Sequence, residues 1–248
     1  NILILVIGSI ASYLFARRTL RPIEEAHSAQ SKFTANASHQ LRTPLATMQA
    51  EIDVALRDKK LSTAEARHVL QSNLEEIGRL RVLSDQLLRL TRIDPSHTKG
   101  QQKTFDAGVL AKRFVHKNHK IYNLVLSKES KPKAMSKGDG VLIEEALTIL
   151  CENAYRYSGG KVVTIGVTKG RNCVRISVAD HGPGMKFEEQ ERVFDRFYRG
   201  KDSARLNPAG HGLGLSLARE IVERYEGTII VKSKLGSGSV FSIVMPLA

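Results

Sequence analysis

Two stretches of the chain carry apolar residues at helical spacing. In residues 33–56 an apolar residue recurs every three or four positions, and a second series runs through residues 70–90. Residues 57–60 break the pattern, and Ser62 followed by Glu65 matches a helix capping box. The pattern predicts two long helices folded back as an antiparallel hairpin. The predicted apolar seam consists of Ala37, Leu41, Leu45, Met48, Ile52, Leu56, Leu70, Leu74, Ile77, Leu80, Leu83, Leu87 and Leu90.

One such hairpin buries its apolar stripe poorly. Paired hairpins, in contrast, bury these stripes in the core of a four-helix bundle. We therefore expect two copies of the chain to associate as a homodimer.

The N-terminal end of the chain has the pattern of a membrane segment. Residues 1–16 carry no charge, and Arg17, Arg18 and Arg21 follow at once. A span needs about 20 apolar residues, so this stretch is short, but the sequence also begins without Met. We expect the end of a transmembrane helix, with a buried core helix as the alternative. The span predicts that the protein is located in the cell (inner) membrane. The arginines after it predict that the remainder of the chain is cytoplasmic, and residues 17–30 are the expected juxtamembrane connector.

The C-terminal part, residues 105–248, mixes helix and strand patterns, and residues 96–104 are the expected linker before it. The predicted helices are residues 141–157 and 215–225, and the predicted strands are residues 162–167, 174–178, 229–231 and 240–244. These elements lack the regular alternation of a doubly wound sheet. The fold class is therefore α plus α/β, with a two-layer α/β sandwich following the hairpin.

Composition narrows the classes of partner. Apolar residues make up 42% and charged residues 25% of the chain, which is typical of a folded globular protein. The net charge of +13 favours anionic partners such as a nucleotide, an acidic protein surface or a membrane. No base-reading helix or basic repeat is evident, so we expect no nucleic-acid binding. Cys151 and Cys173 cannot form a disulfide framework and lack metal-ligand spacing, which indicates a reducing compartment.

His39 is the candidate for chemistry on the first helix. At about 100° per residue it lies roughly 200° from both Ala37 and Leu41, so its ring points away from the seam. Thr43 lies one turn later on the same face, and Pro44 removes a backbone donor, which predicts a bend beside His39. An ordinary surface histidine is the alternative on these grounds alone.

Three clusters in the C-terminal part could bind a nucleotide. Asp180 follows a predicted strand and precedes Gly182 and Gly184, which let a flat ligand approach the backbone. Gly210, Gly212, Gly214 and Leu215 open a predicted helix, whose free N–H groups favour phosphate. Asn153, Arg156 and Tyr157 share one face of another predicted helix, where an amide oxygen can join a Mg²⁺ shell. Each glycine cluster alone is more often an ordinary loop.

The residues around His39 carry a more specific signal. The run from Phe33 to Leu45 (FTANASHQLRTPL) resembles the H-box of two-component sensor histidine kinases. The resemblance implies that residues 31–95 form a dimerisation and histidine phosphotransfer domain. It implies that His39 accepts the γ-phosphoryl group of ATP and passes it to an aspartate of a response-regulator receiver domain. One position departs, because Gln40 stands where the family usually has Glu or Asp, and a neutral amide is a poor base.

A fourth cluster, Phe194–Arg199, has two aromatic residues three positions apart, and on spacing alone its alternative is core packing for the following loop. Taken in chain order, the four C-terminal clusters resemble the N, G1, F and G2 boxes of the same kinases. This implies a Bergerat-type ATP-binding fold, shared with gyrase, Hsp90 and MutL. The implied roles place Asp180 on adenine, Asn153 on Mg²⁺, Arg156 and Arg199 near phosphates, and a mobile lid at residues 186–209. Many members carry a second Asn where this chain has Ile149, so metal coordination would depend more on water and phosphate oxygens.

The resemblance therefore implies a membrane-bound, dimeric protein-histidine kinase that uses ATP and Mg²⁺. Thr43 matches the family position that orients water for dephosphorylating the regulator. Two alternatives remain: a phosphatase-dominant or kinase-impaired member, suggested by Gln40 and Thr43, and a membrane-tethered scaffold that binds ATP without transferring phosphate.

Overall fold

The computed structural model describes residues 2–92, 103–130, 133–200 and 210–248. The chain divides into two compact units, Asn1–Leu80 and Arg81–Ala248. The first holds most of a helical hairpin, and the second holds the end of that hairpin and an α/β domain. The expected linker at residues 96–104 lies mostly outside the described residues.

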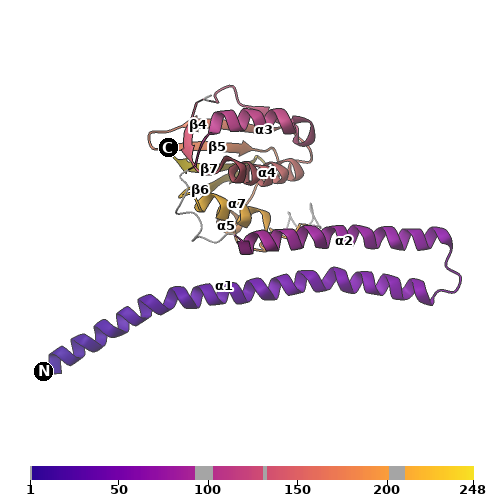
Figure 1. Ribbon diagram of the computed structural model, residues 1–248, viewed down its shortest axis with the longest axis horizontal. Coiled ribbons are helices and arrows are strands. Elements are labelled where there is room, and N and C mark those ends of the chain that lie inside the picture. The colour runs from indigo at the N-terminus through magenta and orange to yellow at the C-terminus, as the bar shows by residue number, and fades with distance from the viewer. Residues whose placement is uncertain (1, 93–102, 131–132, 201–209) are drawn as a thin grey trace. The chain divides into compact units, whose positions relative to one another are not determined.

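The hairpin consists of α1 (Ile2–Arg57) and α2 (Thr63–Arg92) (Figure 1). The predicted capping box is confirmed at the start of α2. The backbone N–H and the hydroxyl of Ser62 donate to Oε2 of Glu65 at 2.9 and 2.7 Å, and the Glu65 N–H donates to the Ser62 hydroxyl at 3.2 Å. These bonds stabilise the ionised carboxylate and lower the pKa of Glu65. Residues close together in the sequence therefore determine where α2 begins after the turn.

The apolar residues of the predicted seam lie along two stripes of the hairpin. One stripe faces the partner helix of the same hairpin, and on it Met48 is only 8% exposed. The other stripe faces outward, and its members are Leu45, Ile52, Leu56, Leu70, Leu74 and Ile77. One copy of the hairpin therefore covers only part of the predicted seam.

Helix α1 contains the residues expected to form a membrane span and a connector, and it continues without a break to Arg57. Over the part of the chain that the structure describes, no helix has a stretch that is both long and apolar enough to cross a membrane. The helix also runs through Pro44 without ending there.

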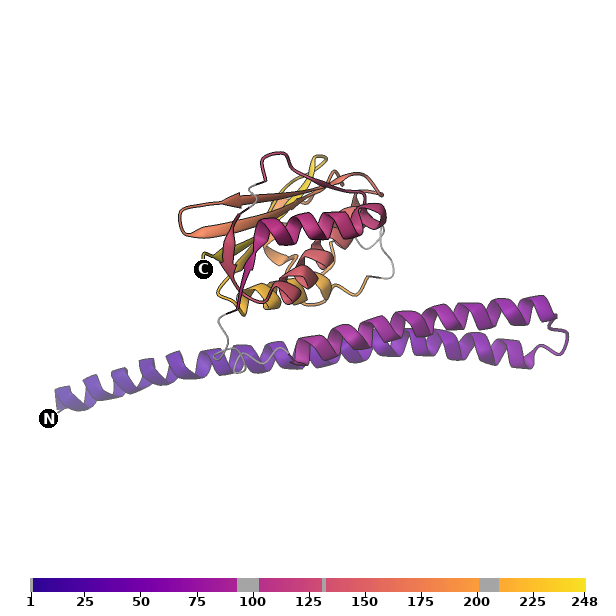
Figure 2. The same cartoon turned by 45° about the horizontal axis from the view of Figure 1, so that its top comes forward.

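The α/β domain is built on a five-stranded sheet of order β2-β4-β5-β7-β6. Strand β2 pairs parallel with β4, and the other neighbours pair antiparallel. Helices α3, α4 and α7 cover one face of this sheet (Figure 2), which confirms the predicted sandwich. The bounds are β1 (Thr104–Asp106), α3 (Ala107–Tyr122), β2 (Leu124–Leu126), β3 (Met135–Lys137), α4 (Gly140–Tyr157), β4 (Val163–Lys169), β5 (Cys173–Ala179), α5 (Phe187–Arg192), α7 (Gly214–Glu223), β6 (Thr228–Lys234) and β7 (Gly238–Pro246).

The core of this domain lies between the sheet and the helices. Ile165, Ile176 and Ile243 from three adjacent strands are fully buried, as are Leu147 and Leu150 of α4. Alternate residues of β4 and β5 are buried, as a half-covered sheet requires. This packing fixes α4, whose last turns carry Asn153 and Arg156.

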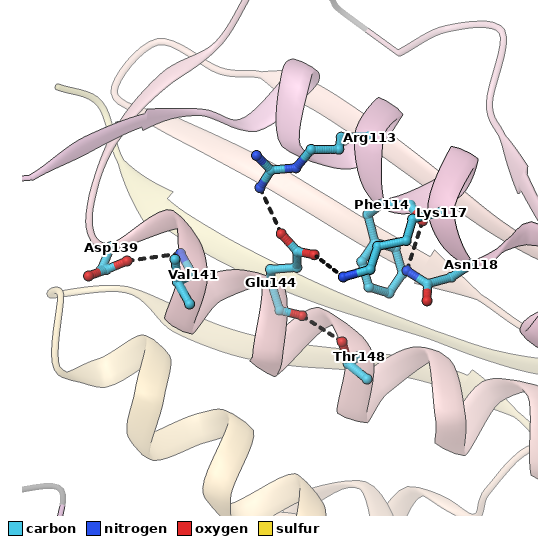
Figure 3. Close-up of polar contacts among 8 residues, drawn as sticks. All are labelled: Arg113, Phe114, Lys117, Asn118, Asp139, Val141, Glu144 and Thr148. Atoms are coloured by element: carbon cyan, nitrogen blue, oxygen red, sulfur yellow. Dashed lines mark hydrogen bonds and ion pairs between the residues drawn. The ribbon is translucent and has the colours of Figure 1, made fainter.

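Helix α3 and strands β1, β2 and β3 were not predicted from the sequence. Asp106 caps α3 by accepting the N–H groups of Gly108 and Val109 at 2.9 and 3.1 Å. Figure 3 shows how α3 meets α4: Arg113 and Lys117 both pair with Glu144, at 2.7 and 3.7 Å. These ion pairs join α3 to α4 on the face of the sheet that both helices cover.

Candidate functional site

His39 lies on an exposed face of α1, as its position off the predicted seam indicates. Together with Arg42, Thr43, Ala46 and Thr47 it lines a shallow open depression along the helix. The Thr43 hydroxyl donates to the backbone carbonyl oxygen of His39 at 3.2 Å, so the two residues share one face. Gln40 is half-buried. A ligand or partner domain can therefore reach the imidazole from solvent.

A second cavity lies in the α/β domain between the end of α4, the segment after β5 and the beginning of α7. Most residues predicted to bind a nucleotide line it: Asn153, Arg156, Tyr157, Asp180, Gly184, Arg199, Gly210, Gly212, Gly214 and Leu215. Gly182 is the exception, because it does not line the cavity. The structure thus brings together residues from three separate parts of the sequence.

Asp180 is the buried carboxylate of this cavity, with 7% of its surface exposed. Its Oδ1 accepts the backbone N–H groups of Gly182 at 2.8 Å and Ser239 at 3.2 Å. Its Oδ2 has no hydrogen-bond partner among the described residues. Burial raises the pKa of Asp180, and the two backbone hydrogen bonds partly oppose that shift. One oxygen is therefore held by the protein, and the other is available to a ligand that donates a hydrogen bond.

Two glycines of the cavity allow close approach of backbone segments. Gly184 has φ +69°, and a Cβ there would fall inside the carbonyl oxygen of Lys234. Gly212 has φ +71°, and a Cβ there would lie 2.7 Å from the carbonyl carbon of Phe197. The Phe197 N–H also donates to the Gly212 carbonyl oxygen at 2.8 Å. Only glycine fits both positions.

The last two turns of α4 supply polar groups to the opposite wall. Asn153 is half-buried, and its amide has no hydrogen-bond partner among the described residues. Arg156 is exposed and pairs with no described carboxylate. Ile149 lies one turn before Asn153, and its Cγ2 is 3.2 Å from the position of a Cβ on Gly214. The wall therefore offers one amide oxygen and one cation beside an apolar side chain.

The aromatic segment before residue 200 packs as its alternative interpretation predicts. Phe194 is 8% exposed and lies edge-on to Phe241, with ring centroids 6.3 Å apart. The Arg192 guanidinium lies 4.5 Å from the ring centroid of Tyr198. Of the predicted lid at residues 186–209, the structure describes α5 and the residues up to 200, whereas residues 201–209 lie outside the described part.

The sequence did not single out several cavity residues. Glu152, Met185, Leu213 and Ser239 line the cavity, and the first three are each next in sequence to a predicted residue. Met185 directly follows the glycine cluster, which could have indicated it. Ser239 could not be predicted from spacing, because it comes from β7 and reaches Asp180 only through sheet pairing.

Comparison with known families identifies both parts of the chain. Residues 29–96 match the His Kinase A (phospho-acceptor) domain. Residues 138–248 match the histidine kinase-, DNA gyrase B- and HSP90-like ATPase family. The hairpin and the cavity thus define a class of protein in which a phospho-acceptor domain precedes an ATP-binding domain. With these two domains in this order, the chain belongs to the two-component sensor histidine kinases.

Curated relatives agree with this assignment. Sensor protein CiaH of Streptococcus pneumoniae is 31% identical over 245 residues, 96% of this chain and 54% of the relative. Sensor protein IrlS of Burkholderia pseudomallei is 33% identical over 235 residues, 92% of this chain and 49% of the relative. The chain therefore spans about half the length of the curated relatives it matches.

Solved structures support the fold. The Acinetobacter baumannii histidine kinase AdeS has a TM-score of 0.62 at 22% identity and covers 84% of this chain and 98% of its own. Histidine kinase ThkA, solved in complex with the response regulator protein TrrA, has a TM-score of 0.67 at 20% identity, covering 95% and 66%. At this identity the likeness concerns the arrangement of elements alone.

Proposed function

We propose that this chain is the signalling part of a sensor kinase that phosphorylates its own His39 from ATP and then transfers the phosphoryl group to an aspartate of a response regulator. The observation that carries the proposal is the carboxylate of Asp180. It is buried at the end of β5, held at one oxygen by two backbone N–H groups, and open at the other. A carboxylate in this arrangement accepts a hydrogen bond from the exocyclic amino group of adenine.

The remainder of the cavity suits the triphosphate. The first N–H groups of α7, beginning at Gly214, have no partners within the helix and favour negative charge. Arg156 supplies a cation on the facing wall, and Gly212 keeps side-chain atoms away from the path of the phosphates. The base would therefore bind near Asp180, with the phosphates extending toward α7.

The wall of α4 also suits a magnesium ion with few protein ligands. Mg²⁺ prefers six oxygen ligands and keeps several waters, so the Asn153 amide oxygen with phosphate and water oxygens makes an appropriate set. Ile149 contributes no oxygen. The ion would neutralise charge on the phosphates, and Asn153 would be the residue that holds it.

The transfer requires a neutral imidazole on His39. A ring nitrogen attacks the γ-phosphorus, the bond to the β,γ-bridging oxygen breaks, and ADP leaves with the electron pair of that bond. The proton on the attacking ring passes to solvent or a neighbouring base. Gln40 cannot take it, because an amide is not basic at neutral pH. Imidazole is already partly neutral near pH 7, so the reaction does not require a carboxylate at position 40.

Assembly and location are part of the proposal. The outward stripe exposes large apolar side chains on one face of each helix, namely Leu45, Ile52, Leu56, Leu70, Leu74 and Ile77. A second hairpin presenting the same stripe would cover it and give a four-helix homodimer. The uncharged residues 1–16 and the arginines after them support attachment to the cell membrane, with His39 and the ATP site on the cytoplasmic side.

Incubation with γ-labelled ATP and Mg²⁺ tests this proposal. We expect an acid-labile, base-stable label on the protein. When the labelled protein is mixed with each member of a panel of purified receiver domains, at least one receiver should take up the label. A stable label that resists acid would indicate a phosphoester and contradict the proposal. A protein that binds ATP but takes no label would instead be the tethered scaffold.

A further inference from the structure

Strand β6 is an outer strand of the sheet, so its backbone pairs with β7 on one side only. At Ser233 the other side is occupied by a side chain. The Gln190 amide, from α5, donates through Nε2 to the Ser233 carbonyl oxygen at 3.0 Å. The Ser233 N–H donates to Oε1 of Gln190 at 3.2 Å. The amide thus pairs with both backbone groups of one residue, as a neighbouring strand would.

Only one of the two orientations of the Gln190 amide satisfies both hydrogen bonds. Turning the amide over would place Nε2 against an N–H group and Oε1 against a carbonyl oxygen, and both contacts would be repulsive. Gln190 and Ser233 therefore form a directional clip between α5 and the edge of the sheet.

The hydroxyl of Ser233 extends the clip toward the nucleotide cavity. It accepts the N–H of Met185 at 2.8 Å and donates to the Gly238 carbonyl oxygen at 3.0 Å. It also lies 3.0 Å from the hydroxyl of Ser239. The Ser239 N–H in turn donates to Oδ1 of Asp180. Hydrogen bonds therefore connect Gln190, through Ser233, to Met185 and Asp180, the two cavity residues at the proposed adenine end.

The segment from Asp180 to Met185 also contacts the turn that joins β6 to β7. The Gly236 N–H donates to the Pro183 carbonyl oxygen at 2.6 Å, and the Asp180 N–H donates to the Ser239 carbonyl oxygen at 2.9 Å. Gly184 makes its close approach to Lys234 in the same place. A shift of β6 at Ser233 would consequently move the wall against which the base binds.

We propose that Gln190 is a positioning residue for the adenine end of the nucleotide site, acting through Ser233. This inference rests on the proposed function, because it assumes that the cavity takes an adenine nucleotide. Gln190 is not among the residues that line the cavity. It holds β6 and the start of the predicted lid together, so that Met185 and Asp180 keep the spacing that selects adenine.

The first experiment compares ADP binding by calorimetry in Gln190→Leu, the wild type and Glu191→Ala. Glu191 is the exposed next residue of α5 and serves as the matched control. Gln190→Leu removes two hydrogen bonds, and we expect ADP to bind about tenfold more weakly. The preference for ATP over GTP should fall as well, while the labelling rate at saturating ATP should stay near the wild-type value. Glu191→Ala should change none of these quantities.

A purely structural role for Gln190 would lower thermal stability and leave the ATP-over-GTP preference as it is. That result, or unchanged ADP affinity, would overturn the inference. If Gln190→Leu does not fold, Gln190→Glu replaces it, since it has nearly the same size but lacks the Nε2 donor. It should show the same loss of affinity and preference.

A double-mutant cycle tests the path through Ser233. Ser233→Ala keeps both backbone partners of Gln190 but removes the hydroxyl that reaches Met185. If the path is shared, the double variant should bind ADP little more weakly than Ser233→Ala alone, whereas additive losses would contradict it. A wild-type protein that fails to bind ADP would contradict the proposed function, while wild-type binding with an unaffected Gln190→Leu variant would contradict only this inference.

Discussion

At the scale of single residues, the proposed recognition of adenine by Asp180 is accompanied by a cost in stability. Its pKa is raised because burial disfavours the charged form. At neutral pH the free protein must keep this carboxylate ionised in a largely dry site. That cost is present above the raised pKa and is absent below the ordinary pKa of Asp, about 3.9.

The first prediction follows from this cost. Asp180→Asn should weaken ATP about 10- to 100-fold, because a charge-assisted hydrogen bond of about 1.5–3 kcal/mol is lost. The same change should raise the melting temperature of the nucleotide-free protein at pH 7, and the gain should shrink as pH falls toward 4. Calorimetry and thermal denaturation measure the two effects, with Asp53→Asn on α1 as control. Loss of stability at pH 7 together with unchanged affinity would contradict both roles.

Gln40 and Thr43 carry the second prediction. If a carboxylate normally takes the histidine's proton, Gln40→Glu should raise the labelling rate, toward the low end of the 10²–10⁴-fold range of general base catalysis. If Gln40 also holds a water for phosphatase chemistry, Gln40→Glu should slow dephosphorylation of the regulator. Thr43→Ala should abolish that dephosphorylation and leave labelling nearly intact. Equal labelling rates in the wild type and both variants would mean that position 40 has no role in proton transfer.

At the scale of elements, α4 connects the core of the domain with the site. Asp139 caps its first turn by accepting the Val141 N–H at 2.9 Å, and it also pairs with Lys103 at 2.8 Å (Figure 3 shows the cap). The hydrogen bond from Lys103 lowers the pKa of Asp139. Its stabilising contribution is therefore present at neutral pH and is lost as pH falls through that lowered pKa.

The third prediction separates the cap from the ion pair. Asp139→Ala should lower the free energy of unfolding by about 0.5–2 kcal/mol, because the cap is lost. Asp139→Asn keeps the cap and loses only a largely exposed ion pair, which is worth about 0.2–1 kcal/mol. Chemical denaturation of the two variants gives the comparison. An equal loss in both would assign the stability to the charge rather than to the cap.

The sequence predicted some of the helices and strands of the α/β domain but not others. Helix α4, helix α7 and strands β4, β5, β6 and β7 were predicted because each has a strong period of its own. Helix α3 was missed although Asp106 supplies a good cap, because its solvent face is rich in Lys and His and leaves a narrow apolar stripe. Strands β1, β2 and β3 are three residues each, too short for a period to show.

The residues of the candidate site also divide into those that a local sequence pattern predicts and those that it does not. Asp180, Asn153 and the glycines around Gly212 could be predicted because each stands in a local motif. The contribution of Ser239 and the clip between Gln190 and Ser233 depend on which strands become neighbours. Such contacts between residues far apart in the sequence cannot be inferred from local spacing.

At the scale of the whole molecule, the outward stripe of the hairpin predicts dimerisation. Leu74 is 69% exposed and lies on the stripe. In the fourth prediction, Leu74→Asp places a charge within the proposed dimer interface and should convert the proposed dimer to monomers. His68→Asp introduces the same side chain about 120° away around α2 and should leave the dimer intact. Sedimentation equilibrium distinguishes these outcomes. Dimers of Leu74→Asp as stable as the wild type would show that the stripe is not the interface.

The central claim is that His39 receives the phosphoryl group, and its location can be measured directly. The chain has eight histidines, and His116 and His119 on α3 are exposed as well, so labelling alone does not identify the acceptor. After reaction with ATP and Mg²⁺, peptides prepared at alkaline pH can be sequenced by mass spectrometry, with His39→Gln as the matched variant. We predict phosphohistidine at residue 39 in the wild type and none anywhere in the variant, which should still bind ADP normally. Phosphohistidine at another position, or a label that persists in His39→Gln, would contradict the account.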